Sequence, residues 1–251
     1  MGTSSSYSGN KDNKTLLPSD YNGQQSKLEV SWQTTKTGFS KYINGHGGSI
    51  GKTAQNYVKA AGGAVGLVKS SKSGIKGAIN IAKLLSDFHQ QGSQKTFENL
   101  GIEYQGKSAK EVLSSLINYI SVSTDSKEDS VARIAAVNAM SKMYEYMEKN
   151  KLDLHSLDKV NIDLMEQVLS TYVECYIWGR ILNDLEYCLE KYSDDIDRTM
   201  EVEQEMKDYV SGKVKITFQI KEIRDKIFGH QSIEDGIETL YEKCYSVLED
   251  M

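Results

Sequence analysis

The group with the most clearly defined chemistry in this chain is the amine at its N-terminus. Gly2 follows Met1, and a small second residue favours removal of the initiator methionine, which leaves a free α-amine on Gly2. An α-amine has a pKa of about 7.7–8.0, so an appreciable fraction is neutral and nucleophilic near neutral pH, whereas a lysine amine has a pKa of ~10.4. We therefore expect Gly2 to be a modification site. The residues that a modifying enzyme would recognise follow it directly: Thr3, Ser4, Ser5, Ser6 and Tyr7.

Acylation is one modification that this terminus permits. The string from Met1 to Ser6 satisfies the short myristoylation pattern M-G-x-x-x-[ST]. A single acyl chain gives only marginal membrane binding, and a basic segment is a usual second signal. An N-terminally acylated adaptor protein is therefore an alternative function for this chain.

A glycine-rich segment ending in Gly51-Lys52-Thr53 is similar to a phosphate-binding loop but lacks one required residue. That loop needs G-x-x-x-x-G-K-[ST], because backbone N–H groups wrap the phosphate and the lysine reaches it. The first glycine of the pattern would stand at position 46, where the chain has His46. We therefore interpret the segment as a glycine-rich hinge that leads into a basic helix.

The other residues with catalytic or metal-binding potential show no spacing that would combine them. The cysteines form no CxxC pair, and no two histidines are three or four positions apart. A solvated helix face is the simplest interpretation of the acidic residues between positions 194 and 205. We therefore expect no catalytic residue, no metal and no cofactor, and hence a non-enzymatic protein. The residues concerned are Cys175, Cys188, Cys244, His46, His89, His155, His230, Asp194, Asp195, Asp197, Glu201, Glu203 and Glu205.

Aromatic side chains are concentrated in two predicted helices. Core packing is the expected role for most of them, and a partial interface with a partner is the alternative, because Tyr and Trp are enriched at interfaces. The residues are Tyr144, Tyr146, Tyr172, Tyr176, Trp178, Tyr187 and Tyr192.

Positive charge is concentrated in residues 31–86, which contain eight lysines and neither aspartate nor glutamate. Residues 87–251 carry 19 basic and 32 acidic side chains. This asymmetry favours an electrostatic contact, either within the chain or with an acidic partner. Nucleic acid is the alternative partner, although the segment has no arginine, which phosphate contacts usually recruit. The docking candidates in the segment are Lys59, Lys69 and Lys76.

The elements that must position these groups are helices, so we predict an all-α fold with a flexible N-terminal tail. Pro18 is the only proline, and nothing after it breaks a helix by ring geometry. We expect three regions: a polar tail at 1–37 that carries the modification motif, a Gly/Lys-rich basic helical region at 38–124, and an acidic helical domain at 125–251. The one apolar feature of the tail is Leu16, Leu17 and Pro18, here named the LLP segment. Such a segment often docks on its own domain or on a partner.

Several helix boundaries are readable from the sequence. Ser108 and Glu111 have the spacing of a capping box at the start of a helix. Asn161 is expected to cap a long helix that ends near Tyr192. The segment 213–218 alternates enough to be a short strand, but a single strand would be unstable, so we expect it to be helical.

Membrane-spanning and secretory segments are not expected. No stretch reaches the ~18 consecutive apolar residues that a membrane-spanning helix needs. The first residues lack the apolar core of a signal peptide. We therefore expect a cytoplasmic protein.

The N-terminal features together resemble one known family. Residues 1–9, the run from Leu16 to Tyr21 and the Gly/Lys-rich stretch around residues 41–63 are similar to the QatB family. That family is the B subunit of the Qat anti-phage defence system.

The resemblance implies a specific chemistry for Gly2. Qat systems contain an ATPase, the B subunit, a QueC-like enzyme and a TatD-like nuclease. QueC-type enzymes activate the carboxylate of 7-carboxy-7-deazaguanine with ATP and normally deliver ammonia to it. A glycine amine in place of ammonia would give an amide that joins the 7-deazaguanine to the protein. This implies that Gly2 is the acceptor, that the QueC-like enzyme and the ATPase are partners, and that the TatD-like nuclease is a further candidate partner.

Overall fold

The computed structural model describes residues 30–121, 125–192, 195–229 and 232–250. Within these ranges the regular secondary structure is helical throughout, which confirms the all-α prediction. The elements in chain order are α1 (Trp32–Ile43), α2 (Ile50–Ala60), α3 (Gly63–Ser70), α4 (Lys72–Gln91), α5 (Ser93–Asn99), α6 (Ala109–Ile120), α7 (Lys127–Lys149), the 3-10 helix η1 (Leu154–Lys159), α8 (Ile162–Tyr192), α9 (Ile196–Phe218), α10 (Lys221–Phe228) and α11 (Ile233–Glu249).

Side-chain caps set several of these boundaries where the sequence predicted them. Ser108 and Glu111 form both halves of the capping box that opens α6. The side chain of Asn161 accepts a 2.8 Å hydrogen bond from the backbone N–H of Leu164, so Asn161 caps α8 as expected. The segment 213–218 is the last part of α9, which confirms the preference for helix over strand.

Helix α1 begins earlier than the sequence suggested, within the segment 1–37 that was expected to be a tail. Ser31 caps this helix by accepting a hydrogen bond from the N–H of Thr34. Thr35, Phe39 and Ile43 then form a buried stripe at intervals of four residues. The stripe was missed because its first member is a polar threonine. The tail prediction otherwise concerns residues 1–29, which lie outside the described residues.

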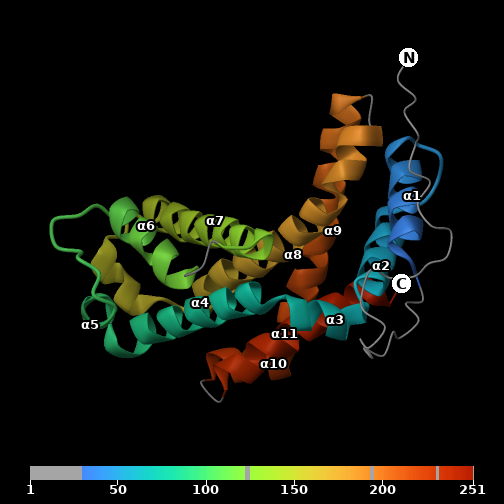
Figure 1. Ribbon diagram of the computed structural model, residues 1–251. Helices are drawn as coiled ribbons and strands as arrows, with labels where there is room; N and C mark the ends of the chain where they lie inside the picture. Colours follow the sequence, from blue (N-terminus) through green and yellow to red (C-terminus); the bar gives the residue numbers. More distant parts are fainter. Residues whose placement is uncertain (1–29, 122–124, 193–194, 230–231, 251) are drawn as a thin grey trace.

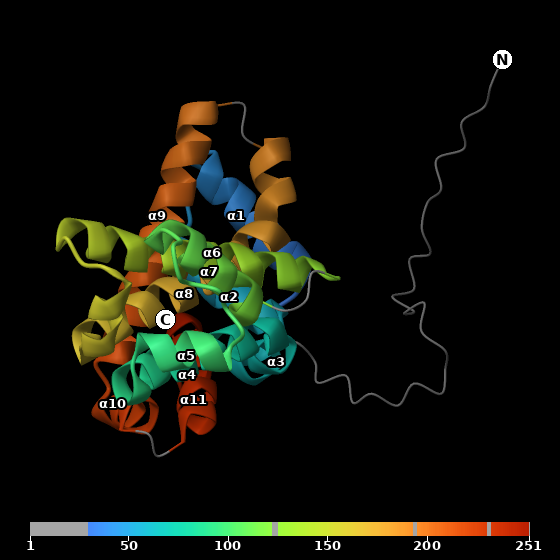
Figure 2. The same ribbon diagram turned by 90° about the vertical axis from the view of Figure 1, so that its left-hand side faces the viewer.

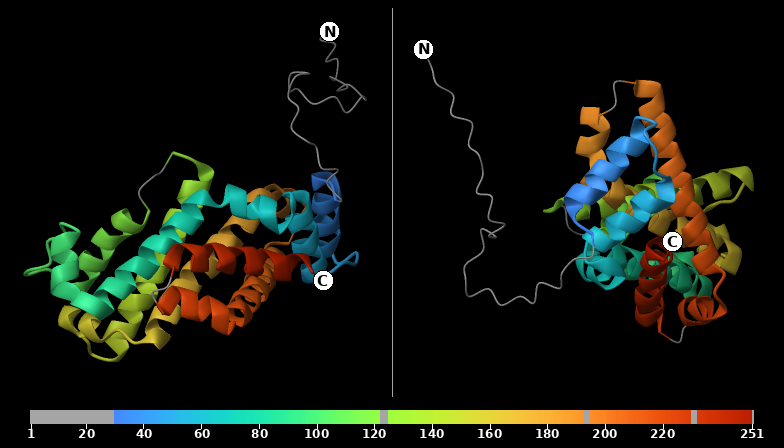
Figure 3. Two further views of the ribbon diagram at one scale, coloured as in Figure 1. Left: turned by 90° about the horizontal axis from the view of Figure 1, so that it is seen from below. Right: turned by 90° about the vertical axis from the view of Figure 1, so that its right-hand side faces the viewer.

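Helix α8 runs through the middle of the molecule and links its two ends (Figure 1). It packs against α7, α4 and α9, and its C-terminal part lies beside α1. Figures 2 and 3 show α1 next to α9 at the end of the molecule opposite α5. Helix α11 contacts α2, α3 and α4, so the last helix of the acidic segment closes over the basic one. Buried apolar side chains from both segments belong to one hydrophobic core.

The contact between α4 and α8 depends on glycines. Tyr172 and Tyr176 are stacked one turn apart on α8, with ring centroids 6.4 Å apart and planes 8° from parallel. Gly77 of α4 faces the Tyr172 hydroxyl and Gly74 faces the Tyr176 ring, so closely that a Cβ at either position would overlap the tyrosine. The missing side chains let the rings lie directly on the backbone of α4.

None of the described helices is both long enough and apolar enough to cross a membrane.

Gly77→Ala should therefore destabilise the protein, because the new methyl group overlaps the Tyr172 hydroxyl. Overpacking of this kind costs about 1–3 kcal/mol of unfolding free energy, measurable by urea denaturation followed by circular dichroism. Gly212→Ala in α9 is the matched control, because a Cβ there meets nothing within 4 Å. The control should raise the stability by about 0.5–1 kcal/mol, as expected for Gly to Ala in a helix.

Adding Tyr172→Phe to Gly77→Ala should recover part of the loss, since it removes the atom nearest to the new methyl group. Equal stability of the two Gly→Ala variants would contradict this description of the α4–α8 contact.

Candidate functional site

The predicted modification site and its flanking residues lie outside the described residues. These are Gly2, Thr3, Ser4, Ser5, Ser6 and Tyr7, together with Leu16, Leu17 and Pro18 of the LLP segment. The described chain begins at Val30 and enters α1 directly after it. The structure therefore defines where this segment joins the helical body.

The three docking lysines stand on three successive helices. Lys59 of α2 is half-buried, whereas Lys69 of α3 and Lys76 of α4 are exposed. Part of the positive charge of residues 31–86 is neutralised within the chain, because Lys83 of α4 forms an ion pair with Glu234 of α11 at 2.5 Å. Lys69 and Lys76 are the exposed candidates that remain for an external partner.

The glycine-rich segment connects two helices and uses its polar groups locally. Ser49 caps α2 by accepting a 3.2 Å hydrogen bond from the N–H of Lys52. The Thr53 hydroxyl donates to the Ser49 carbonyl, and the Lys52 ammonium donates to Gln55 at 2.6 Å. A phosphate-binding loop instead follows a strand and directs these groups at its ligand. The segment is thus a connection between α1 and α2 whose polar groups are used locally.

A polar network sits beneath the junction of α3 and α4, centred on Arg180 of α8. The Arg180 guanidinium donates to the Ser70 carbonyl at 3.0 Å and to the Ser71 hydroxyl at 3.1 Å. The Ser71 hydroxyl lies 2.9 Å from that of Tyr245 on α11. Burial raises the pKa of Tyr245 to about 12, so this phenol stays neutral at physiological pH.

Acidic side chains complete the network from α7 and α8. Glu128 accepts hydrogen bonds from the backbone N–H of Ser73 at 2.8 Å and from the Tyr176 hydroxyl at 2.7 Å. A carboxylate at the first turn of α4 also matches the positive end of the helix dipole. The Tyr57 hydroxyl donates to Asp184 at 2.9 Å. These groups are engaged in holding helices together.

The cysteines of the described residues are not activated thiols. Cys188 and Cys244 are buried, and burial raises the pKa of Cys244 to about 12. Burial also raises the pKa of Cys175, which is partly exposed. A nucleophilic cysteine needs the opposite shift. Among the described residues, no group of three or more His, Cys, Asp or Glu side chains is placed to hold a metal ion.

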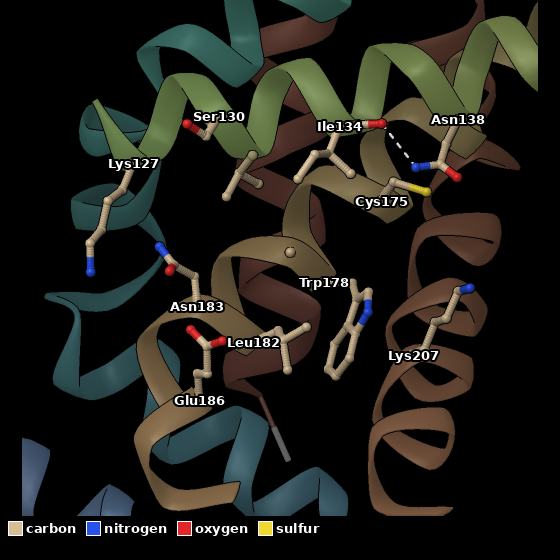
Figure 4. A pocket seen from close by; sticks show the side chains of 12 residues that line it. Lys127, Ser130, Ile134, Asn138, Cys175, Trp178, Leu182, Asn183, Glu186 and Lys207 are labelled. Carbon is tan, nitrogen blue, oxygen red and sulfur yellow. Dashed lines mark hydrogen bonds between the residues drawn. The ribbon is translucent and has the colours of Figure 1, made fainter. Parts of the chain in front are cut away.

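One hollow on the described surface is a cleft of about 410 Å³ between α7, α8 and α9 (Figure 4). We name it the α8 cleft. Trp178 and Leu182 of α8 line it together with Ile134 of α7, a residue that is 61% exposed. The full lining is Lys127, Ser130, Val131, Ile134, Asn138, Cys175, Trp178, Gly179, Leu182, Asn183, Glu186 and Lys207.

The α8 cleft continues as a groove between α8 and the start of α9. A second hollow shares Leu182 and Glu186 with it and extends to Ile196 and Met200. Ile196 is 78% exposed and Met200 61% exposed, which is unusual for large apolar side chains that line one surface. The groove therefore presents a continuous apolar strip with a charged rim.

A family model described as Qat anti-phage system associated protein QatB matches residues 62–248. The chain belongs to the QatB family. The matched range covers the helical body from α3 to α11, so the family assignment now rests on residues beyond the N-terminal motifs that first suggested it. No curated protein and no solved structure matches the chain.

The α8 cleft of this QatB-family chain was not predicted from the sequence. Tyr172 and Tyr176 are buried as expected for core residues, whereas Trp178 is only half-buried and lines the cleft. The position of Trp178 in the sequence was the one indication of this cleft. Trp178 and Leu182 lie on a different face of α8 from Tyr172 and Tyr176. Ile134 carried no such signal, since an isolated surface isoleucine is common.

Proposed function

We propose that this chain acts in the Qat anti-phage system as a non-enzymatic subunit whose N-terminal glycine accepts a 7-deazaguanine. After removal of Met1, the Gly2 amine attacks the activated carboxylate of 7-carboxy-7-deazaguanine on the QueC-like partner. A C–N bond forms, the activating group leaves with its electron pair, and the nitrogen loses a proton to give an amide. The observation that carries the proposal is an unhindered Gly2 amine followed by small polar residues in a member of the QatB family.

The use of polar side chains in the helical body supports a non-enzymatic role. Arg180, Tyr245 and Glu128 are committed to contacts between helices. The cysteines have raised rather than lowered pKa values. On this proposal the helical body recognises partners, and the partner enzyme supplies the catalytic groups.

Docking to the other components is the second part of the proposal. The QueC-like enzyme and the system ATPase are the expected partners, with the TatD-like nuclease as a further candidate, all in the cytoplasm. Lys69 and Lys76 offer exposed positive charge on adjacent helices. An acidic surface on a partner would complement them, and Lys59 would contribute from the neighbouring helix α2.

Gly2→Pro should prevent conjugation, because the secondary ring amine of proline is bulkier and differently oriented. The full-length chain is co-expressed with the QueC-like enzyme and its intact mass is measured. The wild type should lose Met1 and gain the mass of one 7-deazaguanine acyl group, and Lys11→Arg should behave like the wild type. An unmodified wild-type chain beside an active partner enzyme would refute the proposal. A fatty acyl adduct would favour the acylated-adaptor alternative.

The double charge reversal K69E/K76E should weaken co-purification with the QueC-like enzyme or the ATPase, because like charges then face each other. The unfolding transition should stay unchanged, since both side chains are exposed. Lys95→Glu with Lys110→Glu is the control, because these exposed lysines lie on α5 and α6. An equal loss of co-purification in both double variants would mean that the effect comes from net charge and not from the positions of Lys69 and Lys76. Loss of salt-sensitive DNA or RNA binding in K69E/K76E alone would instead support a nucleic-acid contact.

A further inference from the structure

The α8 cleft has the features of a docking site for a short apolar segment. Ile134, Trp178 and Leu182 give it an apolar lining, and Lys127 and Glu186 lie at its rim. Its depth depends on Gly179, because a Cβ at that position would lie 2.9 Å from a methyl carbon of Val131 on α7. The glycine lets α7 and α8 approach closely and leaves the space above them open.

A segment of the same chain is a candidate occupant of the α8 cleft. The LLP segment is the one apolar run in residues 1–29, and Leu17 and Val30 are 13 positions apart. At ~3.3–3.6 Å per residue, the intervening chain can span at most about 43–47 Å.

The point where residue 30 joins the helical body lies close to the cleft. Trp32, near the start of α1, packs edge-on against Tyr57 with ring centroids 5.7 Å apart. Tyr57 in turn donates a hydrogen bond to Asp184 of α8. Asp184 is adjacent in sequence to Asn183, which lines the cleft. The chain thus enters α1 at the level of the cleft, on another side of the same helix α8.

The path from Val30 to the cleft therefore leads from one side of α8 to another. A helix with side chains is about 10–12 Å across, so half of its circumference is well within the reach of 13 residues. We propose that the LLP segment docks in the α8 cleft of its own chain, with Leu16 and Leu17 against Trp178 and Leu182.

Docking in this way would shorten the free part of the N-terminal segment. Gly2 would stand 15 positions before Leu17, on a tether of at most about 50–54 Å from the cleft. The docking itself does not depend on conjugation of Gly2, so the unmodified chain is sufficient for a test.

Trp178 reports on the cleft directly, because the chain has only two tryptophans. Trp32→Phe in the full-length chain leaves Trp178 as the sole tryptophan emitter. Adding Leu16→Ser and Leu17→Ser should shift its emission to longer wavelength and increase its quenching by acrylamide, since the indole becomes exposed to water. Tyr7→Ser in the same background is the matched control and should leave the emission unchanged. Identical spectra for all three proteins would overturn the proposal.

Cys175 provides a second test, because it lines the cleft and is partly exposed. Leu17→Cys in the full-length chain, oxidised in mildly alkaline buffer, should form a disulfide with Cys175 within one molecule, identified by peptide mass mapping. Tyr7→Cys is the control and should not form this bond. A disulfide that joins the introduced thiol of one chain to Cys175 of another would assign the cleft to a second copy and overturn docking in the same chain. Absence of any disulfide at Cys175, with unchanged Trp178 emission, would also overturn it.

Discussion

The packing of two tyrosines of α8 on two glycines of α4 is the contact on which the rest of the helical body depends. Gly74 and Gly77 are one turn apart, so they open one face of α4 to the stacked rings of Tyr172 and Tyr176. Tyr241 of α11 meets the Tyr176 ring edge-on, with centroids 5.7 Å apart. Three helices from distant parts of the chain therefore meet at one aromatic cluster, which α8 and α11 supply and the glycines of α4 contact. Such a close contact fixes their relative positions, because protein interiors tolerate little change in volume.

Different sides of helix α8 make different contacts. One side carries the buried tyrosines, and Arg180 extends from the helix to the junction of α3 and α4. Another side carries Trp178 and Leu182 at the α8 cleft. Since α8 also packs against α1, the cleft and the point where residue 30 enters the helical body are held by the same helix. The body thus places an apolar cleft within reach of the segment that carries Gly2.

The sequence allowed prediction of features that depend on neighbouring residues. The capping box of Ser108 and the Asn161 cap are local, and both were readable from spacing alone. The start of α1 was not, because its buried stripe includes Thr35, whose hydroxyl bonds to a carbonyl of α2. The α8 cleft was not readable either, since its lining comes from three helices. The family was suggested by residues 1–63, although the family match covers residues 62–248.

The fragment-ion mass spectrum of the N-terminal peptide tests most directly whether Gly2 is the acceptor of a nucleobase. The peptide is taken from the full-length chain purified from cells that express the complete system. Met1 should be absent, and the shortest N-terminal fragment, containing Gly2 alone, should already carry the whole added mass. A free Gly2 amine with the added mass on a lysine, or no added mass at all, would contradict conjugation at Gly2.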